Sequence, residues 1–401
     1  MVAHPTISPS TSRSTPSTTV GSKNRYKIKA PTTTNDSGEP SDLCFFDAKR
    51  VLRLIEDERY LSAQELYNSI LDRLQESENN NSGNNDNDND NNNKSKNRKR
   101  PSSSLLKRQN STNKAKVNEK NLFLARELLD ENEDILNKME DRCRLFEKAK
   151  KNLDVNDDWT HAQTMFGVTT YYRKESDGSL SIKLEGTVED ASLFNQIAVL
   201  REIDLTYLWA PFVTSSMTVA HLDKLDTVGW FVVGLPHFGI MRDACFRAIG
   251  CDSMYEDGSV LLVAEGIADR PEDLDGDDKR DLNRTRIEDS LRTDPILDTL
   301  DLPPPPTRTG NGRMTIRSIS AQIHIESATS STTKIVANID LNLPFIPPKL
   351  LDFIMKRMCG LILYKMQGAA RKISRDPITN LHAIKMREDD DFYRRFLLPK
   401  F

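Results

Sequence analysis

Two segments constrain the fold of this chain more than any others: residues 159–266, and the apolar stretch that begins at Pro347 and Pro348. The first shows alternating β-branched and aromatic residues with one helical interval, which predicts strand, turn, strand, helix and then a series of strands. The second carries apolar residues at helical spacing as far as Ile373, and prolines suit a first helical turn. Together they predict an α+β fold in which a curved antiparallel sheet wraps around a long helix and encloses a cavity.

Periodicity locates the individual elements of this domain. The expected strands cover 163–172, 180–184, 214–220, 227–235, 242–249, 259–266, 314–326 and 332–341, and a helix covers 191–203. Asp177 and Gly178 give a hairpin-turn signal between the first two strands.

The rest of the chain divides by composition. In order, we expect a disordered Ser/Thr-rich tail (1–41), a helical hairpin (42–77), an Asn/Asp-rich and basic low-complexity linker (78–117), a charged amphipathic helix of coiled-coil type (118–157), the sheet domain (158–375) and a C-terminal tail (376–401). An acidic, then Pro-rich, insertion at 268–312 is expected to be disordered and to interrupt the sheet domain. Its Asp273–Asp277 phrase has its glycine too early for a calcium loop, so we expect no metal there.

Composition argues against several classes of function. The net charge of -4 is too small to indicate a nucleic-acid partner. The five cysteines form no CxxC pair, which indicates reduced, mostly buried thiols rather than disulfides or a zinc site. No GxSxG, P-loop or dinucleotide motif occurs and the six histidines are scattered, so we expect neither catalytic residues nor a cofactor.

No run approaches the ~18 apolar residues that a membrane span needs, and we expect a cytoplasmic protein. Two alternatives stay open. The N-terminal tail has no acid before Asp36, which is typical of organelle-targeting segments. The basic cluster at 94–100 has the composition of a nuclear-import signal.

Four places in the sheet domain resemble the START family, the lipid-transfer domains related to the steroidogenic acute regulatory protein. They are Tyr171–Tyr172–Arg173 with the Asp177–Gly178 turn; Trp209, Pro211 and Phe212 after the helix; Arg242 and Asp243 at the start of a strand; and Arg317 with Asp340 before the C-terminal helix. Their order and spacing carry the resemblance from about residue 159 to 373, with the insertion removed. The resemblance implies that Trp209, Pro211, Phe212, Asp243, Arg317 and Asp340 are structural landmarks.

The resemblance also implies a helix-grip fold that encloses one lipid between the sheet and the C-terminal helix. We therefore expect intracellular lipid binding or transfer. The candidates for the helix face over the ligand are Leu351, Ile354, Met355, Met358 and Ile362, and those for the sheet side are Trp230, Arg242, Phe246 and Arg247. In sterol-binding members of the family, the cavity arginine, which corresponds to a position near Arg247, pairs with an acid on the preceding strand. The preceding strand here, 227–235, has no carboxylate. The resemblance therefore favours phospholipid or acyl lipid over sterol.

A lipid carrier also needs transient contact with a membrane surface. Three apolar or aromatic segments are candidates: 236–240, 208–212 and the tail 392–398, the last of which is alternatively packed against the domain. The strongest rival function is a non-enzymatic adaptor that binds a protein partner through the N-terminal helices and holds no lipid. An enzyme on a helix-grip fold ranks third, because fold does not fix function.

Overall fold

The computed structural model describes residues 43–82, 120–155, 158–176, 179–235, 240–267, 294–304, 312–342, 348–354 and 359–397. All of them lie in one compact unit, Gly38–Phe401. The expected Asp177–Gly178 turn, the 236–239 loop, the basic cluster, the whole tail 1–41, and residues Met355 and Met358 lie outside the described ranges.

A nine-stranded antiparallel sheet forms the body of the fold, in the order β1-β2-β3-β9-β8-β7-β6-β5-β4. The strands are β1 (Thr160–Met165), β2 (Val168–Lys174), β3 (Leu180–Glu189), β4 (Val213–Asp223), β5 (Asp226–Leu235), β6 (Ile240–Ser253), β7 (Ser259–Gly266), β8 (Thr315–Ser327) and β9 (Ser330–Asp340). Every neighbouring pair is consecutive in sequence except β3 and β9, which pair along the full length of β3. The predicted antiparallel sheet is confirmed.

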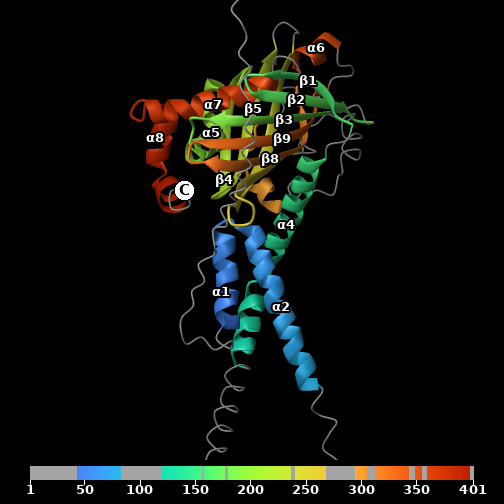
Figure 1. Cartoon of the computed structure of the whole chain (residues 1–401), viewed down its shortest axis with the longest axis vertical. Coiled ribbons are helices and arrows are strands. Elements are labelled where there is room, and N and C mark those ends of the chain that lie inside the picture. Colours follow the sequence, from blue (N-terminus) through green and yellow to red (C-terminus); the bar gives the residue numbers. More distant parts are fainter. Residues whose placement is uncertain are drawn as a thin grey trace, which may run out of the picture. The chain divides into compact units, whose positions relative to one another are not determined.

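Helices cover both faces of this sheet. They are α1 (Leu43–Glu56), α2 (Tyr60–Ser82), α4 (Glu133–Asp154), α5 (Leu193–Arg201), the 3-10 turn η1 (Ile203–Leu208), α6 (Pro348–Phe353), α7 (Cys359–Arg375), α8 (Leu381–Glu388) and the π-helical segment η8 (Asp391–Leu397). The predicted C-terminal helix is present as α6 and α7, and α7 lies across β1, β2 and β3 beside α5 (Figure 1).

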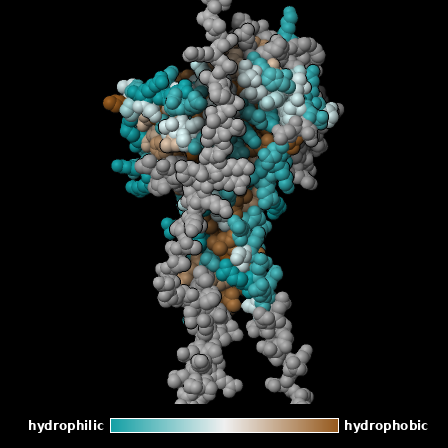
Figure 2. Space-filling model, viewed as in Figure 1, coloured by the Kyte–Doolittle hydropathy of each residue, from teal (hydrophilic) through white to brown (hydrophobic). Residues whose placement is uncertain are grey.

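Alternation along the strands assigns the side chains to two faces. We call "inner" the face that carries Leu180, Ile182 and Leu184 and packs against α7 and α5. The opposite, "outer" face carries Ile249, Cys251, Leu261 and Val263, which form one apolar cluster with α1, α2 and α4. Hydrophobic residues gather between these N-terminal helices, whereas the exposed face of α4 is mainly hydrophilic (Figure 2).

The first hairpin differs from the prediction of one strand over 163–172. Met165 pairs with Val168, so Phe166 and Gly167 form a two-residue turn between β1 and β2. Both turn residues have positive φ, 57° and 77°, as a type I′ turn requires. A phenylalanine in the left-handed region is uncommon, which is why the aromatic, β-branched composition concealed the turn.

The expected disordered insertion is wrong for residues 294–304. Pro295–Thr299 form a short 3-10 helix, η6, and Leu297 is buried on the outer face with Val228 and Cys245. Asp294 caps this helix by accepting a hydrogen bond from the amide of Ile296. The end of the insertion is therefore part of the folded structure.

Candidate functional site

The inner face offers apolar surface that the protein itself does not fill. In the central strands β8 and β9, Ile319, Ile335 and Ile339 are only partly buried although they lie among fully buried neighbours. Phe231, Phe246 and Tyr172 on other strands share this environment. Protein interiors are normally packed to crystal-like density, so apolar side chains that stay partly exposed beside a buried cluster are the surface of this face against which an apolar ligand would pack.

On α7, the residues buried against the sheet form a stripe next to the predicted position Ile362. Cys359, Leu363, Met366, Ala370 and Ile373 are buried, whereas Ile362 is partly exposed. Ile354 is buried in the inner cluster as expected. Leu351 lies in α6, and nothing is described of its side chain.

The sheet candidates divide between the two faces. Phe246 packs in the inner cluster, where it contacts Phe231 at a ring-centroid distance of 5.5 Å. Arg242 has the same strand parity, and its guanidinium donates to the carbonyl oxygens of Leu341 and Met241. Trp230 and Arg247 lie on the outer face, where Trp230 donates to Asp243 and Arg247 is buried in an ion-pair network. Their positions do not support contact with a ligand on the inner face.

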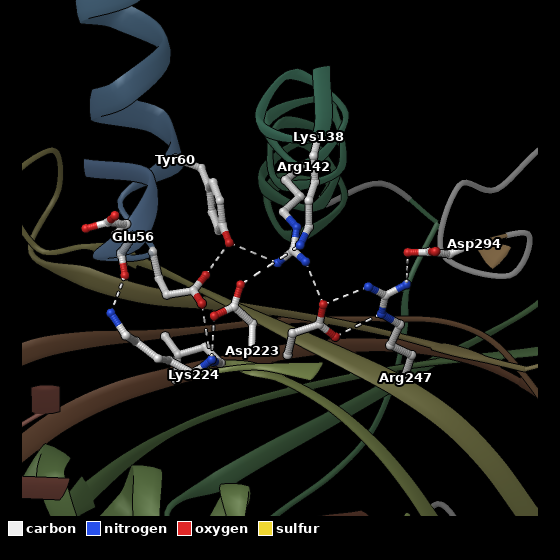
Figure 3. Close-up of polar contacts among 11 residues, drawn as sticks. Glu56, Tyr60, Lys138, Arg142, Asp223, Lys224, Arg247 and Asp294 are labelled. Atoms are coloured by element: carbon white, nitrogen blue, oxygen red, sulfur yellow. Dashed lines mark hydrogen bonds and ion pairs between the residues drawn. The ribbon is translucent and has the colours of Figure 1, made fainter. Parts of the chain in front are cut away.

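That outer-face network is the most concentrated set of charges among the described residues (Figure 3). Arg247 makes a two-pronged bond to Asp226, with Nε–Oδ1 at 2.8 Å and Nη2–Oδ2 at 2.7 Å. Arg142 of α4 donates to Asp226 Oδ2 at 2.5 Å, and Asp294 accepts from Arg247 Nη1 at 2.8 Å. Asp226 and both arginines are almost fully buried, so each charge depends on the others.

A second buried acid extends the network toward the α1–α2 junction. Glu58 accepts from the Tyr60 hydroxyl and from the amide of Leu225, and Tyr60 in turn accepts from Arg142. Burial, followed by the nearby Asp223 carboxylate, raises the pKa of Glu58 to about 7, and these hydrogen bonds and Arg142 only partly oppose the shift. The N-terminal helices are thus joined to the sheet by polar as well as apolar contacts.

Asp226 is an acid on the strand before Arg247, where the sequence predicted none. Sequence analysis found no acid on the strand before Arg247, because it began that strand at Thr227. The strand β5 begins one residue earlier, and Asp226 is the acid that pairs with Arg247. The pair lies on the outer face, however, and is directed away from the space beneath α7.

The expected landmark residues make contacts within the domain. Asp243 accepts from Arg313 and Trp230, and Arg317 pairs with Asp340 at 3.1 Å. The following three lie in or next to the turn after η1: Trp209, Pro211 and Phe212. Phe212 has a φ of 66° and stacks edge-on with Phe353 of α6, which ties this turn to the C-terminal helices.

The C-terminal segment packs against the domain. Phe392, Tyr393, Phe396 and Leu397 are all buried in the inner cluster, and the Tyr393 hydroxyl donates to Glu202 at 2.5 Å. Of the two alternatives for this tail, docking is therefore the one observed for residues up to Leu397.

Other expectations about chemistry can be compared with the described residues. All five cysteines are free and buried, as predicted, and burial raises the pKa of the Cys359 thiol to about 12. Within the described ranges, no His, Cys, Asp and Glu side chains gather in a group suited to a metal ion. No helix described there is both long and apolar enough to cross a bilayer.

The strand order, the long α7 across the inner face and the helices after β3 define a helix-grip fold, as predicted. No protein-family model matches the chain, and a comparison with curated proteins found no match. Among solved structures, the chain is similar to human StAR-related lipid transfer protein 5, with 14% identity over 58% of this chain and 97% of that one and a TM-score of 0.43. It is also similar to human STARD10, with 15% identity, 64% and 83% coverage and a TM-score of 0.40.

A third likeness is to the Zhui aromatase/cyclase of a Streptomyces species, at 11% identity, 49% and 96% coverage and a TM-score of 0.29. Each of these is a likeness of fold alone. The helix-grip assignment itself rests on the topology of this chain.

Proposed function

We propose that this protein binds one lipid between the inner face of its sheet and α7, and that it carries this lipid without catalysing a reaction. One observation carries the proposal: Ile319, Ile335 and Ile339, on the inner face of the central strands, are only partly buried although they pack against the apolar cluster that includes α7. Each buried methylene of an acyl chain placed there would contribute about 0.8 kcal/mol.

The finer proposal is that the ligand is a phospholipid or another acyl lipid rather than a sterol. Its support is the orientation of Arg247, whose bonds to Asp226 and Asp294 are made on the outer face. This arginine–carboxylate pair, which the family resemblance linked to sterol binding, is held beneath α4 and α2 instead. An acyl chain requires only apolar contact from the inner face.

The rival function is an adaptor whose N-terminal helices bind a protein partner while the helix-grip domain holds no lipid. The two functions are separated by purifying the full chain from cells, extracting it with organic solvent and identifying lipids by mass spectrometry. A carrier yields a stoichiometric long-chain lipid, and it takes up labelled phospholipid from liposomes. Absence of both signals would exclude the carrier function and leave the adaptor.

A further inference from the structure

Two polar side-chain atoms on the inner face are shielded from solvent without a hydrogen-bond partner. Gln163 of β1 and Thr170 of β2 stand directly opposite each other in the strand register. Neither Gln163 Nε2 nor Thr170 Oγ1 makes a hydrogen bond, although both atoms are shielded from solvent and Thr170 is fully buried. Leaving such a group unpaired costs about 1–3 kcal/mol, so native proteins rarely do so without a bound partner.

The helix above these two atoms approaches them with a residue that has no side chain. Gly360 of α7 lies over the pair, and a methyl group added to it would be 3.5 Å from Gln163 Nε2 and 3.6 Å from Thr170 Oγ1. The same methyl group would be 3.9 Å from Met165 Cε. These are ordinary contact distances, so a methyl group would cover both polar atoms, which the glycine leaves uncovered on this side. We call these two polar atoms, with the glycine that faces them, the Gln163–Thr170 notch.

The chemistry of the notch limits what occupies it. An amide nitrogen donates hydrogen bonds, and a threonine hydroxyl both donates and accepts. Neither side chain carries a charge that would offset the cost of burying an ion. An uncharged oxygen satisfies both groups, because its lone pairs accept from Gln163 and from Thr170.

We propose that the Gln163–Thr170 notch binds an uncharged oxygen, a hydroxyl or an ester carbonyl, of the lipid enclosed beneath α7. This rests on the proposed function and adds to it the position at which the polar part of the ligand is held. The surrounding inner face would then bind the hydrocarbon chain, so the notch sets which lipid is accepted and which way round it lies.

The test uses the full chain and three labelled probes with nearly the same hydrocarbon chain: oleyl alcohol, methyl oleate and 1-octadecene. The first carries a hydroxyl, the second an ester carbonyl and the third no oxygen. One hydrogen bond to a neutral group contributes about 0.5–1.5 kcal/mol, so we expect the alcohol and the ester to bind up to about tenfold more tightly than the alkene.

Two variants and a matched control examine the notch itself. Thr170→Val keeps the shape of the side chain and removes the hydroxyl, and Gly360→Ala places a methyl group in contact with both polar atoms. Thr169→Val removes a hydroxyl from the neighbouring position on the other face, where it bonds to Thr164 at 3.1 Å. We expect the first two variants to abolish the preference for an oxygen and to keep binding of 1-octadecene, and the control to retain the preference.

Folding of the variants is verified by thermal unfolding, since loss of an unpaired hydroxyl or of a helical glycine should not destabilise the chain. Equal binding of all three probes would overturn the proposal that the notch binds a lipid oxygen, and the two polar atoms would then bond to a buried water only. The proposed lipid binding itself would not be contradicted by that result. A preference that survives in Thr170→Val would overturn it as well. Failure of every probe to bind, including the alkene, would overturn both the notch and the proposed function.

Discussion

Asp226 and Arg247 form a two-pronged ion pair in which the carboxylate is fully buried and the guanidinium nearly so. Arg142, from a helix that is distant in the sequence, shares the same carboxylate. Two cations therefore depend on one acid, and the acid lies where the N-terminal helices meet the sheet.

Replacing Asp226 by asparagine is expected to reduce the free energy of unfolding by about 3–5 kcal/mol, because it leaves two buried arginines without their counter-charge. Chemical denaturation measures this change. Lys138→Met is the matched control: its pair with Asp223 is 3.9 Å long and exposed, so we expect a change within about 0.5 kcal/mol. Similar effects for the two variants would contradict the structural role of the network.

Glu58 predicts how stability depends on pH. Its folded-state pKa of about 7 lies above the value of 4.5 for an exposed glutamate, so the folded protein holds a proton that the unfolded chain releases. The stabilisation from this group is complete below about pH 4.5 and is lost as the pH rises through about 7. Denaturation midpoints followed from pH 4.5 to 7.5 should decrease in this window after the other groups are accounted for.

The corresponding variant is Glu58→Gln, which cannot titrate and has the same size. Because glutamine resembles the protonated glutamic acid, we expect the two stabilities to be similar near pH 4.5 and to separate as the pH rises through about 7, where the wild type loses stability and the variant does not. Parallel curves would show that another group causes the dependence.

A third prediction concerns the C-terminal segment. Tyr393→Phe removes the buried hydroxyl that donates to Glu202, and bonds to charged groups contribute about 1.5–3 kcal/mol. We expect a loss of that size in thermal or chemical unfolding. Tyr255→Phe is the control, because Tyr255 is 58% exposed. If Tyr393→Phe and Tyr255→Phe both reduced the stability by the same small amount, the C-terminal segment would not be docked as observed.

The two faces of the sheet predict that only one of two neighbouring residues in β9 affects lipid loading. Ala337 stands between Ile182 and Ile319 in the strand register and faces inward, whereas Val336 faces outward. Ala337→Phe fills the inner face, and overpacking of about 1–3 kcal/mol corresponds to lipid binding that is roughly 5- to 150-fold weaker. Val336→Phe should leave the lipid recovered per protein unchanged, as measured by mass spectrometry.

Much of the fold could be predicted from the sequence, because apolar residues recur with a period of about 2 in strands and about 3.6 in amphipathic helices. The strand 259–266 was predicted with the bounds of β7, and β8 and β9 were within two residues at each end. The turn at Phe166–Gly167 was missed because nothing in a run of aromatic and β-branched residues signals a positive φ at phenylalanine.

The site was harder to predict, for a reason that Arg247 makes clear. Alternation along the strand places Arg242 and Arg247 on opposite faces of the sheet. It does not say which of the two faces lies beneath the helix, because tertiary packing decides that. Asp226 was missed because strand ends are the least certain feature of a sequence prediction, and one residue decided whether the strand contained an acid. The Gln163–Thr170 pairing depends on the hairpin register, which the missed turn had hidden.

The β3–β9 pairing also bears on how the chain reaches this structure. All of β4 to β8 lies between these two strands in the sequence, so their pairing closes a long loop, and the entropy of closure must be overcome before any contact forms. Proteins dominated by such distant pairings fold slowly. Until the pairing forms, β3 and β9 each present an unpaired edge bearing leucine and isoleucine, the kind of edge through which incomplete chains associate. We expect the yield of folded protein to depend on how fast β3 and β9 pair. Slower synthesis at low temperature is expected to increase this yield.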